Sequence, residues 1–179
     1  MNYCSNCGQP LVVRIPEGDT LPRYVCDHCD AIHYQNPKIV AGCIPVWGNE
    51  ILLCKRGIEP QLGKWTLPAG FMENGETVQQ AAARETLEEA LAPVKDLELF
   101  GMFNIPHVNQ VYVMFRASMP ERQFGAGHET LSCKLVTEDQ IPWPEIAFPV
   151  VDRTLRLFLG DRRDNEFRIH TGDIEPRRG

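Results

Sequence analysis

The chain has 179 residues, of which 43% are hydrophobic and 23% are charged, enough for one domain of ordinary size with a buried core and a small extra module. Its formal net charge of −6 argues against non-specific binding to nucleic acid or to an anionic membrane. No apolar run approaches the roughly 20 residues of a transmembrane helix, and the N-terminal sequence lacks the basic and apolar regions of a secretory signal. We therefore expect a cytoplasmic protein that does not act at membranes.

Cysteines dominate residues 1–34. Two Cys-x-x-Cys pairs are separated by 18 residues, a spacing typical of a four-thiolate zinc site. Disulfides are the alternative, but a cytosolic setting disfavours them. Because so short a segment buries little surface, Zn²⁺ would supply most of its folding free energy. We predict a structural zinc ribbon over residues 1–34, with the ligands Cys4, Cys7, Cys26 and Cys29.

The histidines and the net charge of residues 1–34 indicate what this segment can bind. His28 and His33 lie near the cysteines, but with four thiolates present we expect both to be surface residues. The segment carries two arginines against four carboxylates, the wrong sign for a phosphate-binding footprint. We therefore do not expect nucleic acid as a partner. A structural role, a dimer contact or a cover over the substrate site fits the charge better.

The main domain is expected over residues 35–160, after a linker at Tyr34–Pro37. A strand over Lys38–Trp47 is followed by a Gly-Asn turn and a partner strand over Glu50–Lys55. Residues 63–70 are interpreted as one further short strand that leads into a turn. Three cysteines in strand-like runs are interpreted as small core hydrophobes, namely Cys43, Cys54 and Cys133.

A helix is predicted from Thr77 to Leu91. Alanine, leucine, glutamate, glutamine and arginine fill this stretch and are strong helix formers. Thr77 can cap the start with Gln80 three residues later. Pro93 prevents the helix from continuing.

One face of this helix is acidic. Glu85, Glu88 and Glu89 stand at i, i+3 and i+4, so their side chains project together and repel by roughly 0.2–0.5 kcal/mol per pair. Arg84 can pair with Glu88 but cannot neutralise three carboxylates. An isolated pattern of this kind is usually a solvated helix face. Carboxylate oxygens are, however, the ligands that Mg²⁺ and Mn²⁺ prefer.

The rest of the chain alternates strands with turns and ends in a helix and a charged tail. The tail, residues 161–179, is expected to carry at most one short strand at Phe167–His170. Strands are expected at Leu97–Phe103, Gln110–Ser118 and Leu131–Val136, and a closing helix at Val150–Leu159.

The acids follow a glycine-rich turn at fixed spacing, Gly-x5-Glu-x7-Arg-Glu-x2-Glu-Glu, from Gly70 to Glu89. This is the pattern of the Nudix box, and the chain resembles a Nudix hydrolase. It departs from the pattern at Leu91, where a glycine is usual, and at Thr86 and Ala92. The resemblance implies an α/β fold, the Nudix α/β/α sandwich with a mixed sheet, here preceded by the zinc ribbon.

The resemblance also implies a reaction and roles for the box. Nudix hydrolases cleave a nucleoside diphosphate linked to a further group, through attack of water on phosphorus with Mg²⁺ or Mn²⁺. By family position, Glu85 and Glu89 are the principal metal ligands, Glu88 shares the metal, and the Gly70 carbonyl adds an oxygen. Arg84 is expected to hold the carboxylates in place, and Glu76 to brace the turn.

Residues outside the box are expected to complete the site. Glu129, in the loop Gly125–Thr130, is assigned as general base or further metal ligand, with a solvated loop acid as the alternative. His128 is a weaker candidate. Two cations, Lys55 and Arg56, could face substrate phosphates or end a solvated strand. Three aromatic residues could stack a flat ring or belong to the core, namely Phe103, Tyr112 and Trp47.

The substrate is predicted from shorter resemblances. A zinc ribbon before a Nudix domain is the layout of NADH diphosphatases, but their aromatic-proline segment after the box does not match residues 102–110 here. Pro142-Trp-Pro144 looks similar but lies two strands further on. The chain instead resembles the FAD diphosphatase type, in Tyr34–Lys38, Leu52–Arg56, Trp65–Gly70 and Ile105-Pro106. This implies cleavage of FAD to FMN and AMP, with ADP-ribose as a competitor and NADH as the alternative.

A second class of function stays open at this point. The domain could bind a nucleotide as a regulator while the ribbon contacts a partner. The intact acidic face argues against this alternative, and the acidic ribbon argues against nucleic acid. Because Nudix sites are often completed across a dimer, we expect a homodimer.

Overall fold

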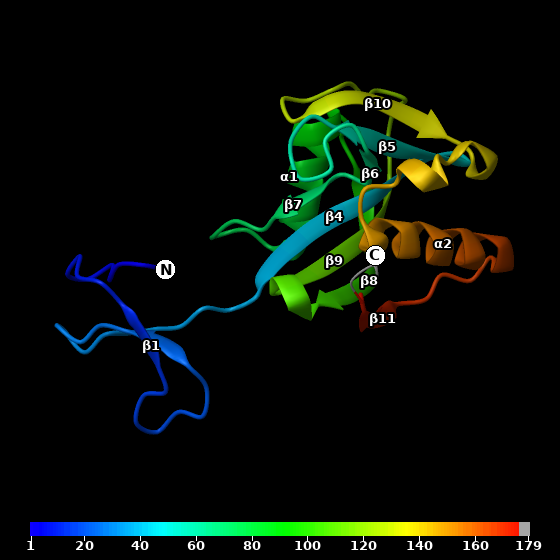
Figure 1. The fold of residues 1–179 in the computed structure, drawn as a ribbon. Coiled ribbons are helices and arrows are strands. Elements are labelled where there is room, and N and C mark those ends of the chain that lie inside the picture. The colour runs from blue at the N-terminus through cyan, green and yellow to red at the C-terminus, as the bar shows by residue number, and fades with distance from the viewer. Residues whose placement is uncertain (176–179) are drawn as a thin grey trace. The chain divides into compact units, whose positions relative to one another are not determined.

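The computed structural model describes residues 1–175 and separates into two compact units, Met1–Pro37 and Lys38–Gly179. Figure 1 shows the course of the chain. In the part of the chain that the structure describes, no helix has the length and apolar character needed to cross a membrane.

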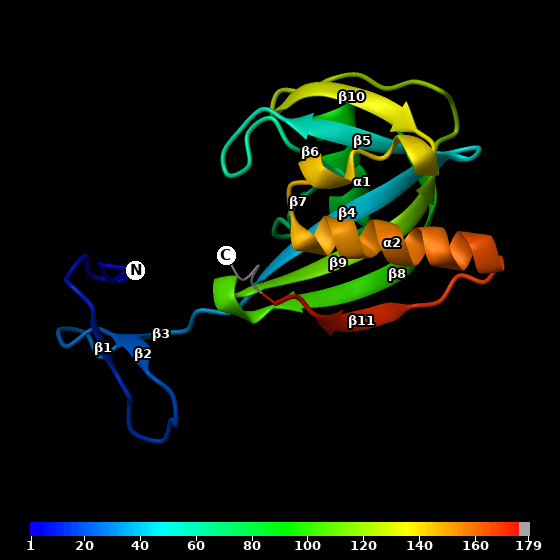
Figure 2. The same cartoon turned by 45° about the vertical axis from the view of Figure 1, so that its right-hand side comes forward.

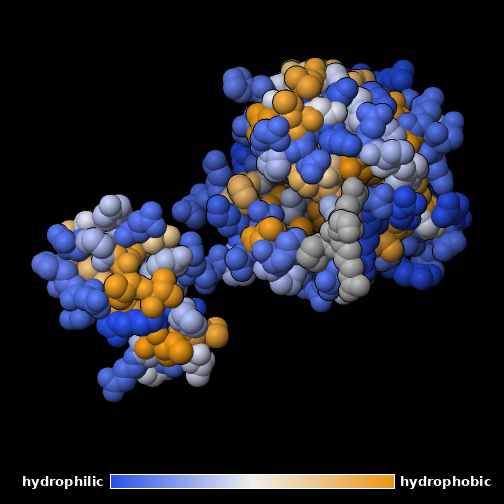
Figure 3. Space-filling view, in the orientation of Figure 1, coloured by the Kyte–Doolittle hydropathy of each residue, from blue (hydrophilic) through white to orange (hydrophobic). Residues whose placement is uncertain are grey.

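The first unit is a small antiparallel sheet with almost no apolar core. Its strand order is β1-β2-β3. Val25 and the cysteines Cys4 and Cys26 are buried, whereas Val13 is 62% exposed. Figure 3 shows hydrophobic side chains at the surface of this unit. The three strands are β1 (Val12–Arg14), β2 (Arg23–Val25) and β3 (Ile32–His33).

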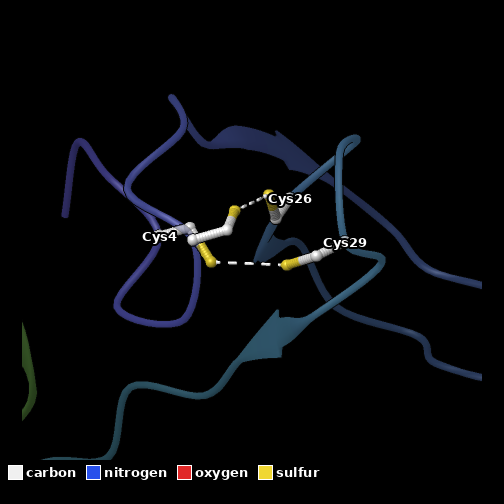
Figure 4. Close-up of side chains that lie close together, drawn as sticks. Cys4, Cys26 and Cys29 are labelled. Atoms are coloured by element: carbon white, nitrogen blue, oxygen red, sulfur yellow. Dashed lines mark hydrogen bonds between the residues drawn. The ribbon is translucent and has the colours of Figure 1, made fainter.

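Four thiols take the place of a core. Cys4 Sγ lies 3.6 Å from Cys29 Sγ, Cys7 Sγ lies 3.4 Å from Cys26 Sγ, and all four sulfurs lie within 4.8 Å of one another (Figure 4). A tetrahedral Zn²⁺ with Zn–S bonds of about 2.3 Å holds its sulfurs about 3.8 Å apart. The arrangement therefore fits the predicted zinc site.

His33 differs from the expectation of a plain surface residue. Its Nε2 lies 3.3 Å from Cys4 Sγ, and the Asn6 amide donates to the same sulfur. Although burial opposes ionisation, hydrogen bonds from Asn6 and His33 lower the pKa of Cys4 to about 6. His33 thus favours the thiolate form that a metal needs, without replacing a sulfur ligand.

The second unit is built on one eight-stranded mixed sheet, whose main path runs β10-β5-β4-β9-β8-β11. The central pair, β4 and β9, is parallel over its whole length, β8 is antiparallel to β9, and β10 is antiparallel to β5. The main strands are β4 (Lys38–Trp47), β5 (Glu50–Arg56), β8 (Lys95–Ile105), β9 (Gln110–Ser118), β10 (Thr130–Val136) and β11 (His170–Asp173).

The sheet divides between β4 and β5. These strands pair only next to their turn, and two short strands continue the pairing separately: β6 (Trp65–Thr66) on β5, and β7 (Ala69–Phe71) on β4. The sequence predicted one strand over residues 63–70. Pro68 has no amide to donate, which interrupts the strand there, and its carbonyl accepts instead from Cys43 N at 3.1 Å.

Helices cover both faces of the sheet (Figure 2), so the predicted α/β/α sandwich is confirmed. Helix α1 packs alanines against Ala41, Cys43 and Phe115, and α2 packs against a larger core that includes Phe103. The helices are α1 (Val78–Ala90) and α2 (Pro149–Asp164), with short 3-10 helices η1 (Pro106–Val108), η2 (Glu138–Gln140) and η3 (Trp143–Glu145).

Both ends of α1 form as the sequence suggests. Thr77 and Gln80 make a reciprocal capping box. Leu91 closes the helix in the left-handed conformation, at φ 48° and ψ 29°. Leucine therefore takes the backbone geometry for which glycine is usual, and the helix ends where the family pattern ends.

The C-terminal segment differs from the predicted tail. Helix α2 extends past Leu159 to Asp164, and β11 joins the main sheet parallel to β8, three residues beyond the expected strand. Buried Asp161 explains this: it accepts hydrogen bonds from the Arg168 amide at 2.9 Å and pairs with His170 Nε2 at 2.8 Å. Residues 161–173 thus pack with the main domain, and residues 176–179 of the predicted tail lie outside the described residues.

Zinc should hold the first unit together without supporting the second. We expect about one zinc per chain, and we expect Cys26→Ser to abolish zinc binding because Cys26 is fully buried in the cluster. Elemental analysis measures the zinc. Hydrogen exchange should show loss of amide protection confined to residues 1–37, because the second unit has its own core.

Cys133→Ser is the matched control, since Cys133 is a half-buried thiol of the second unit. It should keep the zinc. Full zinc content in Cys26→Ser, or loss of protection across the main sheet, would contradict the assignment.

Candidate active site

The acidic face of α1 opens onto a cleft of about 750 Å³. Its walls come from β7, the end of β5 and the loop before β10. The charged side chains that line it include Arg56, Arg84, Glu85, Glu88, Glu89 and Glu129. The acids predicted from helical spacing and the acid predicted from the loop therefore meet in one place.

Arg84 connects the acids to the turn. Its Nη1 donates to Glu85 at 2.8 Å and to Glu88 at 3.1 Å, and its Nη2 donates to Glu76 at 2.8 Å and to the Phe71 carbonyl at 3.1 Å. Hydrogen bonds from Arg84 lower the pKa of Glu76, which also accepts from the Glu73 amide. One guanidinium thus fixes the turn and helix relative to each other.

Gly70 lies directly against the carboxylate of Glu85. A Cβ atom built at position 70 would overlap with the Glu85 carboxyl group. Only glycine lets the backbone approach so closely. The close approach brings main chain of β7 beside the acids, as the predicted ligand role of the Gly70 carbonyl requires.

Glu89 is the most perturbed acid of the cleft. Burial, together with repulsion from Glu85, raises its pKa to about 8, although Arg56 and the Ala69 amide oppose the shift. Burial also raises the pKa of Glu85, whose bond to Arg84 offsets it in part. Buried carboxylates with too few cations fit a hard divalent metal ion.

The carboxylates are spread more widely than the thiolates of the ribbon. Within residues 1–175, only the four cysteines bring three or more candidate ligand atoms within 4.8 Å of one another. Salt bridges from Arg84 hold Glu85 and Glu88 in their present positions. An ion bound between the acids would draw the carboxylates closer together. The donor set, three carboxylates and a carbonyl, suits Mg²⁺ or Mn²⁺.

Helix α1 also positions the loop that carries Glu129. The Gly125 and Gly127 amides donate to the carbonyls of Ala90 and Glu89 at 2.7 and 3.0 Å. A Cβ atom at Gly127 would overlap with the Glu88 carbonyl, so this approach again requires glycine. The loop brings Glu129 and His128 to the cleft, where the charge of Glu129 contributes to the raised pKa of Glu89.

The predicted substrate residues separate into two groups. Arg56 and Tyr112 line the cleft. Lys55 does not, because successive strand residues face opposite sides, and its Nζ lies 5.7 Å from the centre of the Trp65 ring. Phe103 is fully buried in the core under α2, and Trp47 packs against another core cluster, so both belong to the core, the alternative given for them. The structure thus corrects the predicted substrate contacts of Lys55 and Phe103.

No motif in the sequence predicts that two further residues line the cleft. Phe148 precedes α2, and its ring centre lies 5.1 Å from the guanidinium carbon of Arg56. Gln110 begins β9. Neither belongs to a motif, and only the folded chain brings them beside the acids.

Comparison with known proteins separates the chain in the same way as the structure does. The family model described as "Nudix N-terminal" matches residues 2–35, and the NUDIX domain model matches residues 36–158. A crystal structure of a NUDIX hydrolase from Nitrosomonas europaea is 52% identical, with a TM-score of 0.95, covering 98% of this chain and 100% of that one. An ADP-ribose pyrophosphatase from Streptococcus suis, 20% identical with a TM-score of 0.62 over 76% of this chain and 99% of that one, shares the fold.

Curated relatives include NAD-capped RNA hydrolases NudC. The protein from Yersinia enterocolitica is 32% identical over 78% of this chain and 52% of its own length. The one from Edwardsiella ictaluri is 36% identical over 64% of this chain and 43% of its own. The chain spans about half the length of these relatives. With the NUDIX domain model matching residues 36–158 behind the N-terminal module, the chain belongs to the Nudix family.

Proposed function

We propose that the protein is a divalent-metal-dependent hydrolase that cleaves the diphosphate bond of an NAD-type dinucleotide. The meeting of four carboxylates and Arg56 in one cleft supports a site for a metal-bound diphosphate. The alternative, a binding module without catalysis, does not account for Glu85 and Glu89, whose pKa values are raised by burial and by neighbouring carboxylates.

An NAD-type substrate differs from the FAD or ADP-ribose that the sequence analysis predicts. Short shared segments favoured FAD or ADP-ribose, and the missing aromatic-proline segment argued against NADH. The curated relatives are instead hydrolases of NAD-capped RNA, which favours the NADH alternative. FAD and ADP-ribose carry the same ADP half and are the substrates to compare.

The charged residues of the cleft and Gly70 then have the following roles in the proposed reaction. Glu85, Glu88, Glu89 and the Gly70 carbonyl would hold the metal. When bound, Mg²⁺ or Mn²⁺ would polarise the diphosphate and lower the pKa of the attacking water. Arg56 would bind diphosphate oxygens. Arg84 is a positioning residue, because its donors are engaged with the acids and the turn.

Glu129 is proposed as the base that takes the proton of the attacking water. It lines the cleft and sits on a loop fixed to α1 by two backbone hydrogen bonds. The expected homodimer and cytoplasmic location belong to the same proposal. A mass measurement in solution tests the first, and fractionation of the producing cell tests the second.

The direct test is a substrate panel with Mg²⁺ or Mn²⁺. We expect NADH or NAD⁺ to give the highest kcat/KM, with AMP and the nicotinamide mononucleotide as products, above FAD, ADP-ribose, dinucleoside polyphosphates and CoA. Chromatographic product identification checks this. A higher kcat/KM for FAD would restore the first expectation, and no hydrolysis of any diphosphate would favour the binding module.

Glu129→Gln tests the base. Removing the proton acceptor should lower kcat by about 10²–10⁴-fold with little change in KM, as for other general bases. Glu121→Gln is the matched control, because Glu121 is an exposed acid in the same connection that does not line the cleft. Turnover in Glu129→Gln equal to that of the control would remove the assignment.

Glu89 gives a pH-dependent prediction. Its pKa is raised from 4.5 to about 8, so its contribution to the stability of the metal-free protein is present below pH 4.5 and is lost as the pH rises through 8. Metal binding must displace this proton, so the affinity for Mn²⁺ should rise by up to about tenfold per pH unit below pH 8. Calorimetric titration from pH 6 to 9 measures this.

The Glu89→Gln variant should bind Mn²⁺ weakly. Its stability and its Mn²⁺ affinity should both depend less on pH than those of the wild type. If the metal-free wild type and this variant showed the same pH dependence of thermal stability, the raised pKa would be contradicted.

A further inference from the structure

Two thiols of the main sheet face each other, apart from the zinc cluster and outside the proposed reaction. Cys54 on β5 and Cys133 on β10 are directly opposed in the antiparallel register, and their sulfurs lie 3.7 Å apart. Directly opposed residues of antiparallel strands have Cα atoms about 4.5–5.5 Å apart, within the range of about 4.4–6.8 Å that a disulfide spans. A bond between these two sulfurs therefore leaves the strand pairing as it is.

The two thiols differ in their access to solvent. Cys133 is half-buried, whereas Cys54 is 1% exposed and packs in a core cluster with Ala90, the last residue of α1. A small oxidant therefore reaches Cys133 first, and Cys54 stands beside it as the second thiol that turns an oxidised sulfur into a disulfide. Cys43 is fully buried on β4, where its thiol donates to the Ala82 carbonyl.

Cys133 also connects β10 to the loop that carries Glu129. Its Sγ lies 3.1 Å from the Gly125 carbonyl oxygen and 3.8 Å from the Glu89 carbonyl oxygen. A thiol has a single proton to donate, and the Gly125 carbonyl is the nearer acceptor. A disulfide has no S–H, so oxidation removes this donor and draws the Cys133 sulfur toward Cys54. The loop is then held less firmly beside the acids.

We propose that Cys54 and Cys133 are a redox-sensitive pair that a peroxide converts to a reversible disulfide, and that this modification lowers the activity of the cleft. The bond itself is independent of the proposed function. The effect on activity rests on it, because the loop carries the proposed base Glu129.

The oxidation has two steps. The Cys133 sulfur attacks one oxygen of hydrogen peroxide, the O–O bond breaks, and a sulfenic acid and one water form. The Cys54 sulfur then attacks the sulfur of the sulfenic acid, the S–O bond breaks, and the hydroxyl leaves with the Cys54 proton as a second water. Two electrons pass from sulfur to oxygen. A dithiol reverses the change by thiol–disulfide exchange, as expected of a transient disulfide in a reducing compartment.

Peptide mapping of the full, zinc-loaded protein after exposure to hydrogen peroxide tests the bond. We expect one cross-linked peptide pair that joins Cys54 to Cys133, lower in mass by two hydrogen atoms, and its loss after dithiothreitol. Zinc content measured in the same samples selects peroxide doses at which the ribbon stays intact. No oxidation of Cys133, its oxidation to sulfinic acid alone, or a bond to any other cysteine would overturn the proposal.

Kinetics of matched variants tests the effect on activity. Oxidation should lower kcat of the wild type by about ten- to a hundredfold, since displacing a catalytic group by about 1 Å costs up to about 10²-fold, and dithiothreitol should restore it. Cys133→Ser keeps a donor for the Gly125 carbonyl but cannot form the bond, so it should be active and insensitive to peroxide. Cys43→Ala is the control and should stay as sensitive as the wild type. An equal loss of activity in Cys133→Ser would contradict the assignment.

Hydrogen exchange separates this inference from the proposed function. The amides of Gly125 and Gly127, which donate to the Ala90 and Glu89 carbonyls, should exchange faster in the oxidised protein than in the reduced one. If the bond and the faster exchange are found but no diphosphate is hydrolysed, the proposed function fails and the redox-sensitive pair stands. If the bond forms while hydrolysis and exchange are unchanged, control by the pair fails and the proposed function stands.

Discussion

Repulsion between carboxylates on one helix face is the constraint around which the second unit is arranged. Helical geometry places Glu85, Glu88 and Glu89 side by side, and burial makes the ionisation of Glu85 and Glu89 costly. Arg84 relieves part of this through contacts with Glu85, Glu88 and Glu76. The remaining imbalance of charge at Glu89 is what the proposed divalent cation would offset. The turn, the helix cap and the loop of Glu129 all serve to keep these acids in place.

Both units bring candidate metal ligands together, but the ligands differ in their chemistry. In the ribbon, thiolates gather with little apolar surface around them, and His33 supports one of them by a hydrogen bond. In the main domain, a large core comes first and the acids lie at its edge. Soft sulfur ligands select Zn²⁺ and hard oxygen ligands select Mg²⁺ or Mn²⁺. The two proposed metal sites therefore differ in the kind of ion that their ligands prefer.

Local features of the fold followed from the sequence, and features made by distant residues did not. Strands β4 and β9 have the predicted bounds, and the acidic face needs only helical spacing. Pro68 divides a strand that was expected to be continuous. The C-terminal strand depends on Asp161, whose partners are seven and nine residues away in the chain and brought back by the fold.

The site shows the same division. The box identified the acids, because its residues lie within a single turn and helix. It could not tell that Lys55 faces away or that α2 covers Phe103, since both depend on how layers pack. A cavity of about 400 Å³ is lined by residues of η1, β9 and the start of α2, and no pattern in the sequence links these segments.

Gly70 and Gly127 have a consequence for how such an enzyme can change. At both positions the backbone touches a group of α1 so closely that even a methyl group does not fit. At Gly127 the neighbour is main chain, so this part of the wall is closed to larger side chains, whereas a larger side chain at position 70 would displace the Glu85 carboxyl group. Variation near the acids is then left to other residues of the lining, such as Gln110 and Phe148. These residues lie in other parts of the chain than the acids and can change independently of them.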